Sequence, residues 1–204
     1  MKPVKIIIAL LLSSTLFACD SFSEYSKEDV VYKIQGTDND PKDINILVNR
    51  LSSYQTSWFS SVTYEQASAE IIFKHGAPDE EVIKFMSQTL GVLSFYGEED
   101  PNIVVSNEHI RQVEASISAD NVSILFGLND DGEQLMNQIT NKHIGKEMLV
   151  KLDGNILIQT KLTAVLGKHF EIVINISAEE ATRTAALLRN GNLGRPISLK
   201  KSKT

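Results

Sequence analysis

The chain has 204 residues and a formal net charge of -6, with 42% hydrophobic and 23% charged residues. This composition is ordinary for a globular protein, so it excludes a largely disordered chain, and the length suffices for one large or two small domains. An acidic protein has no general affinity for nucleic acid or anionic lipid, so we expect no nucleic-acid partner.

The first residues have the layout of a secretory signal. Residues 1–5 carry two lysines, residues 6–12 are an unbroken apolar run, and Ala18 precedes Cys19, the only cysteine in the sequence. A basic segment, a short apolar segment and a small residue before the cleavage point are typical of a signal peptide, and this apolar run is too short to span a bilayer. The sequence therefore predicts a signal over residues 1–18.

The end of this signal, Leu16-Phe17-Ala18-Cys19, resembles the lipobox of bacterial lipoproteins. The resemblance implies that Cys19 becomes the first residue of the mature protein and carries acyl chains that anchor it to the membrane. Asp20 follows directly and resembles the signal that retains such proteins at the inner membrane. We expect a lipid-anchored protein at the periplasmic face of the cell membrane, with the inner membrane favoured over the outer. Residues 19–29 are expected to form a polar tether.

Residues 30–96 alternate between strand and helix patterns. Strands are predicted over residues 30–35, 61–66, 69–74 and 91–96, and helices are predicted to begin at Asp40-Pro41 and at Pro78-Asp79. The resulting order, β-α-β-β-α-β, is that of a ferredoxin-like split unit. We expect this unit to form a base subdomain, followed by an acidic boundary over residues 97–102.

The pattern of residues 103–193 predicts a second α+β lobe with antiparallel or mixed sheets. Its clearest element is a tight hairpin, because Asp153-Gly154 separates two apolar-rich runs. Asn129 is expected to cap one helix, and Ser177 with Glu180 forms the capping box of a closing helix. Residues 194–204 are a basic tail that is expected to fray.

The same region resembles the first periplasmic domain of SecD and SecDF, accessory subunits of the bacterial protein-translocation channel. The matching segments keep the family's order: 103–105 with His109-Ile110, 122–132, 140–146, 150–156, 176–181 and 185–193. The resemblance implies a base-and-head fold, an envelope location and, more loosely, contact with translocating polypeptide. The sequence departs from the family's pattern in two respects. The family's glycine-rich stretch before the last head strand is reduced here to Gly167. In addition, no segment after Cys19 is long and apolar enough to span a membrane.

The sequence contains no pattern that identifies an enzyme, a cofactor site or a metal site. The histidines have no metal-ligand spacing and are expected at the surface or as helix caps: His75, His109, His143 and His169. The acidic cluster at Asp130, Asp131 and Glu133 is interpreted as a helix start. We therefore expect a non-enzymatic binding module; the alternatives are an envelope hydrolase with an unrecognised site and a modulator or immunity-type lipoprotein.

For a binding module, the contact surface is expected on the head lobe, around the hairpin and the segment over residues 162–168, which carries no strong core pattern. The candidate binding residues are Asp153, Gly154, Asn155 and Lys168. Partners consistent with the resemblance are unfolded polypeptides, which can add as a strand to an exposed sheet edge, or translocation-channel subunits.

Overall fold

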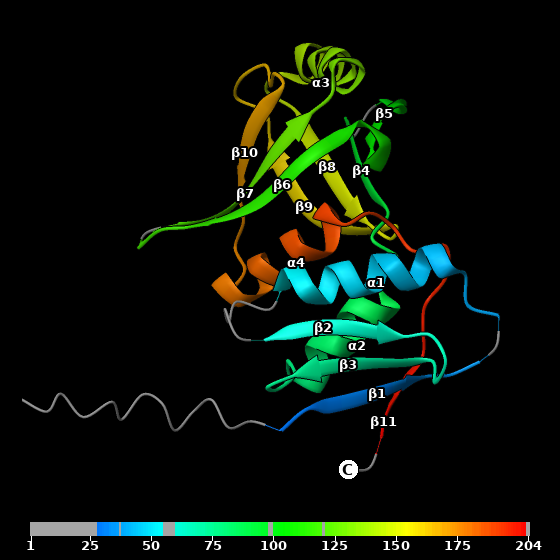
Figure 1. The fold of residues 1–204 in the computed structure, drawn as a ribbon. Coiled ribbons are helices and arrows are strands. Elements are labelled where there is room, and N and C mark those ends of the chain that lie inside the picture. Colours follow the sequence, from blue (N-terminus) through cyan, green and yellow to red (C-terminus); the bar gives the residue numbers. More distant parts are fainter. Residues whose placement is uncertain (1–27, 37, 55–59, 98–99, 120, 203–204) are drawn as a thin grey trace, which may run out of the picture.

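The computed structural model describes residues 28–36, 38–54, 60–97, 100–119 and 121–202. The chain forms two lobes, called here the base and the head, which lie at the bottom and top of Figure 1. The base holds the first three strands, the first two helices and the last strand, whereas the head holds the strands between them and helix α3 (Asp130–His143). Helix α4 (Ala178–Arg189) lies between the two lobes (Figure 1).

The base is one antiparallel four-stranded sheet covered by helices on the side that faces the head (Figure 1). Its strand order is β11-β1-β3-β2, with bounds Leu199–Lys201, Val30–Ile34, Glu70–Lys74 and Ser61–Glu65. Since β3 is antiparallel to both β1 and β2, the latter two are parallel and enclose it, as in a split β-α-β unit. Helices α1 (Pro41–Tyr54) and α2 (Glu80–Gln88) bury apolar faces against this sheet and α4.

The strand predicted to close the base is not in the base sheet. Residues 93–97 form β4 (Leu93–Gly97), which pairs with β5 (Asp100–Ser106) and β8 (Glu147–Leu152) in the head. The base is closed instead by β11, so the expectation of a frayed tail is wrong for these residues. Ile197 is fully buried just before β11, and its amide donates to the Ser87 carbonyl at 2.8 Å, which holds the tail in place.

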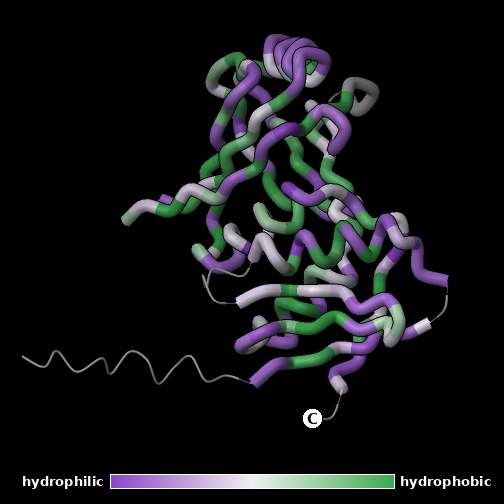
Figure 2. Tube along the Cα trace, viewed as in Figure 1, coloured by the Kyte–Doolittle hydropathy of each residue, from purple (hydrophilic) through white to green (hydrophobic). Residues whose placement is uncertain are grey.

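The head consists of two sheets joined through aromatic side chains. One sheet has the order β5-β4-β8-β9, with β9 at Asn155–Lys161; the other has the order β10-β7-β6, with bounds His169–Val173, Val122–Leu128 and Ile110–Ile117. Phe95 of the first sheet contacts Phe126 and Phe170 of the second edge to face, with ring centroids 5.2 and 5.8 Å apart. In Figure 2 hydrophobic segments are concentrated on the strands, whereas the trace of α3 (Asp130–His143) is mostly hydrophilic.

The helix ends follow the sequence signals. The Asn129 side chain accepts a hydrogen bond from the Gly132 amide at 2.8 Å and caps α3. Ser177 and Glu180 exchange hydrogen bonds at 3.1 and 2.9 Å, which confirms the capping box of α4. The apolar side of α4 is buried and packs against α1 and β6, so this helix joins the lobes.

His143 is buried rather than at the surface. It is the last residue of α3, and its Nδ1 lies 2.7 Å from the Ile139 carbonyl oxygen. The imidazole packs directly on Gly97, where a Cβ atom would lie 2.4 Å from the ring. A glycine is therefore required at the end of β4 to admit this ring.

Candidate functional site

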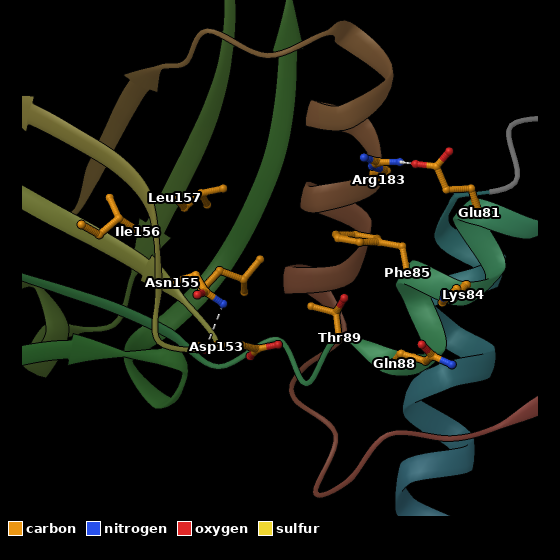
Figure 3. Close-up of a pocket in the computed structure, with 11 residues that line it drawn as sticks. Glu81, Lys84, Phe85, Gln88, Thr89, Asp153, Asn155, Ile156, Leu157 and Arg183 are labelled. Atoms are coloured by element: carbon orange, nitrogen blue, oxygen red, sulfur yellow. Dashed lines mark hydrogen bonds and ion pairs between the residues drawn. The ribbon is translucent and has the colours of Figure 1, made fainter.

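A groove of about 520 Å³ lies at the junction of base and head (Figure 3). Its walls come from α2, from α4 and from the turn between β8 and β9. Its lining includes Glu81, Lys84, Phe85 and Gln88 of α2, Asn155, Ile156 and Leu157 of β9, and Arg183 of α4. The groove is therefore built by parts of the chain that are distant in sequence.

The hairpin wall is positioned by the turn at Asp153 and Gly154. Both residues have positive φ, +50° and +80°, as a type I′ turn requires. The two carboxylate oxygens of Asp153 accept hydrogen bonds from the amides of Leu90 and Val92 at 2.8 and 2.7 Å. Asp153 thus fastens the hairpin to the segment that connects α2 with β4.

The same connecting segment is held from the base by Arg50. Its guanidinium is fully buried and donates to the carbonyl oxygens of Met86, Thr89, Leu90 and Gly191 at 2.6 to 3.0 Å. Three of these carbonyls belong to residues just after the C-terminal end of α2 or α4, where the helix dipole favours a positive charge. Burial lowers the pKa of Arg50 to about 10, although the carboxylates of Asp153 and Asp43 oppose that shift, so Arg50 is charged at neutral pH.

The base wall presents an aromatic ring beneath a cation. The Arg183 guanidinium lies 4.9 Å from the centroid of the Phe85 ring, and it forms ion pairs with Glu81 at 3.2 Å and Glu180 at 3.5 Å. The Arg183 side chain is only 18% exposed, which limits its freedom. In Figure 3 the Phe85 ring points from α2 toward the hairpin side of the groove, whereas Arg183 is paired with Glu81.

Lys84 is the groove's remaining cation. It is exposed, and the described part of the chain provides no carboxylate partner for it. Opposite, Ile156 is 56% exposed, which is high for a large apolar side chain on a strand. The groove therefore offers apolar surface on both walls and one cation without an ionic partner.

The structure separates the predicted binding residues. Asp153 and Asn155 line the groove, and Gly154 forms the turn beside it. Lys168 instead forms an ion pair with Asp130 at the start of α3; the pairing raises the pKa of Lys168 and lowers that of Asp130. Cys19 and Asp20 lie outside the described residues.

Sequence reasoning did not assign a role to Arg50 or Arg183. Arg50 follows Leu47 by three residues and precedes Leu51, so it occupies the apolar stripe of α1. An arginine on such a stripe is the signal that could have identified a buried cation. No comparable signal exists for Arg183, because its ring partner Phe85 comes from another helix.

The described residues contain neither a candidate metal site nor a candidate membrane-spanning helix. Within the described residues no cluster of histidine, cysteine and acidic side chains could hold a metal ion. In the same residues no helix has both the length and the apolar character needed to cross a membrane.

Comparisons with known proteins identify the fold. Residues 96–194 match the family model described as SecDF, P1 head subdomain. The chain is 24% identical over 195 residues to the protein translocase subunit SecD of Rickettsia typhi, a match that covers 95% of this chain and 36% of that protein. It is 36% identical over 87 residues to SecD of Endomicrobium trichonymphae, covering 41% of this chain and 18% of that protein. The chain thus spans about a third or less of the length of these relatives.

Two solved structures share the fold over most of this chain. A chain described as part of SecDF, a membrane component that enhances protein export, superposes with a TM-score of 0.58 at 15% identity, covering 86% of this chain and 99% of that one. SecDF in its super-membrane-facing form gives a TM-score of 0.60 at 16% identity, covering 84% of this chain and 29% of that one. The resemblance predicted from the sequence is confirmed: the chain resembles the first periplasmic domain of SecD and SecDF.

Proposed function

We propose that this protein is a non-enzymatic, membrane-anchored binding module of the periplasm that holds extended segments of polypeptides in transit. The observation that carries the proposal is the groove between base and head, which is bordered by the first residues of the edge strand β9. The relatives are named protein translocase subunit SecD, and one solved relative is described as enhancing protein export, which supports a client of this kind.

The groove has the chemistry for an extended chain with mainly apolar side chains. Phe85 on one wall and Ile156 and Leu157 on the other offer apolar contact, and the Lys84 ammonium can donate a hydrogen bond to an acidic side chain or to a main-chain carbonyl. A short segment buries little area and loses conformational entropy when it binds, so we expect a Kd on the order of 1 µM or weaker. Such weak binding allows release.

Anchoring makes weak binding useful. In this proposal Cys19 carries the acyl chains, Asp20 retains the protein at the inner membrane and residues 19–29 serve as the tether. Confinement near the point where chains emerge raises the effective concentration of the module without any added contact. Translocation-channel subunits are then the expected neighbours of the bound client.

The proposal is tested with the full chain purified from membranes in detergent. Its affinity is measured for reduced, carboxymethylated α-lactalbumin, which cannot fold, and for the native form of the same protein. We expect saturable binding of the unfolded form and none of the native form. Equal binding of both forms, or no binding of the unfolded form, contradicts the proposal.

A further inference from the structure

Among the described residues strand β9 ends its sheet, so one side of its main chain is not paired with another described strand. It has seven residues, whereas β11, an edge of the base, has three. An edge strand presents rows of N–H and C=O groups that another extended chain can bind. Only the groups that point away from β8 are available to such a chain.

The pairing register with β8 fixes the direction of these groups in the second half of β9. The Leu162 amide donates to the Lys146 carbonyl at 2.9 Å, so Leu162 points toward β8. Main-chain groups alternate along an antiparallel strand, and Thr160 therefore also points toward β8. The N–H and C=O groups of Gln159 and Lys161 then point outward.

A bulge interrupts this pattern near the groove. The register between β8 and β9 shifts between Val150 and Lys151, which leaves Leu157 without an opposite residue. Regular pairing with an added strand can therefore run from Lys161 to Gln159. The same hydrogen-bond pattern cannot continue past the bulge to the turn between β8 and β9. Beyond the bulge lies the groove lined by Ile156, Leu157 and Phe85.

We infer that an extended polypeptide segment adds to β9 as a further strand, bonded to the main chain of Gln159 and Lys161, and continues into the groove. This inference rests on the proposed function and specifies its binding mode. The Gln159 side chain is hydrogen-bonded to Glu147 on β8, so its main chain supplies the contact. Lys84 lines the groove and Lys161 is the last residue of β9, so the path has an exposed cation toward each end, which favours a segment with an acidic side chain among apolar ones.

The test compares two substitutions at one position. Gln159→Pro removes an outward N–H and leaves the bonds to β8, whereas Gln159→Ala removes only the side chain. The Kd of the full chain for reduced, carboxymethylated α-lactalbumin should rise about tenfold or more in the proline variant, the equivalent of about 1.4 kcal/mol, and stay within about twofold in the alanine variant.

A matched control exists on the other head sheet. Val173 of β10 lies next to Ile174, whose amide donates to the Val122 carbonyl at 3.0 Å, so the Val173 amide points outward at another sheet edge. Val173→Pro should leave the Kd unchanged. A loss of affinity in Val173→Pro, with none in Gln159→Pro, places the added strand on β10 and overturns the inference.

Amide hydrogen exchange of the unmodified protein gives a second readout that does not depend on how a variant folds. Adding the unfolded probe should slow exchange at Gln159 and Lys161 and leave Val173 unchanged. Binding of the probe without protection on β9 overturns the inference while the proposed function stands. If β9 is protected from exchange without the probe and sedimentation shows dimers, the edge is bound by a second copy of this chain. That result also overturns the inference. If the unmodified protein binds no probe, both proposals fail.

Discussion

Arg50 and Asp153 hold opposite sides of the same residue. The Arg50 Nη2 atom donates to the Leu90 carbonyl oxygen at 2.6 Å, and the Asp153 Oδ2 atom accepts from the Leu90 amide at 2.8 Å. Arg50 belongs to the base and Asp153 to the head, so Leu90 is fixed by both lobes where the chain passes between them. This arrangement sets the position of the hairpin relative to α2, and hence the width of the groove.

We predict that Arg50→Lys lowers the free energy of unfolding by about 3 kcal/mol. A lysine cannot reach four carbonyl oxygens from one planar group, so buried carbonyls lose their donors. Chemical denaturation of the full chain measures the effect. The matched control is Arg111→Lys, because Arg111 also donates to main-chain carbonyls but is exposed, and its change should stay within about 0.5 kcal/mol. Similar losses in both variants contradict the role given to Arg50.

We predict that Gly154→Val destabilises the head by about 1 to 3 kcal/mol. The position has φ +80°, which β-branched residues avoid, although no described atom beyond the two neighbouring residues lies within 4 Å of the added Cβ. Gly154→Asn should lose much less, because asparagine tolerates the left-handed region. Gly167→Ala is the control, since Gly167 is not at positive φ. If the asparagine and valine variants melt alike, backbone strain is not the cause.

Acid should weaken the start of α4 through Glu180. Its hydrogen bonds with Ser177 hold the pKa of Glu180 below the ordinary value of 4.5. The stabilisation is complete above pH 4.5, where the group is ionised in both states, and is lost as pH falls through the lower folded-state pKa. Glu180→Gln should flatten the stability profile between about pH 5 and 3, whereas Glu179→Gln, outside the capping box, should not. Parallel profiles for unmodified protein and Glu180→Gln contradict this.

The tail contributes to the base core through Ile197. We predict that Ile197→Ala lowers the free energy of unfolding by about 2 to 4 kcal/mol, because it leaves a cavity at a fully buried site. Its exposed neighbour provides the comparison, and Ser198→Ala should change stability by less than about 0.5 kcal/mol. An Ile197→Ala variant as stable as the parent means that the tail does not hold the base together.

Membrane attachment is predicted to depend on Cys19. Cys19→Ala should accumulate as an unprocessed precursor without incorporated fatty acid, because the thiol that carries the acyl group is gone. Metabolic labelling with palmitate and the mobility of the protein in gels measure both effects, with Ser21→Ala as control. Processing and labelling of Cys19→Ala at the level of the parent contradicts the anchor.

Local sequence signals predicted local structure well. The Asp153-Gly154 turn and the Ser177–Glu180 capping box depend on neighbouring residues, and both are confirmed. The partner of β4 could not be predicted, because its apolar alternation fits either lobe and Phe95 finds its aromatic contacts on strands far along the chain. The groove was missed for the same reason: its walls meet only after α2, α4 and β9 have packed.

The most direct test of the central claim is photo-crosslinking in intact cells from a probe amino acid at Asn155, which lines the groove. A probe at Gln134, on the exposed side of α3, is the control. The proposed function predicts adducts between the Asn155 probe and secreted precursors or translocation-channel subunits, and few or none from Gln134. Equal labelling from both positions, or no protein adduct from Asn155 while precursors are being exported, would contradict it.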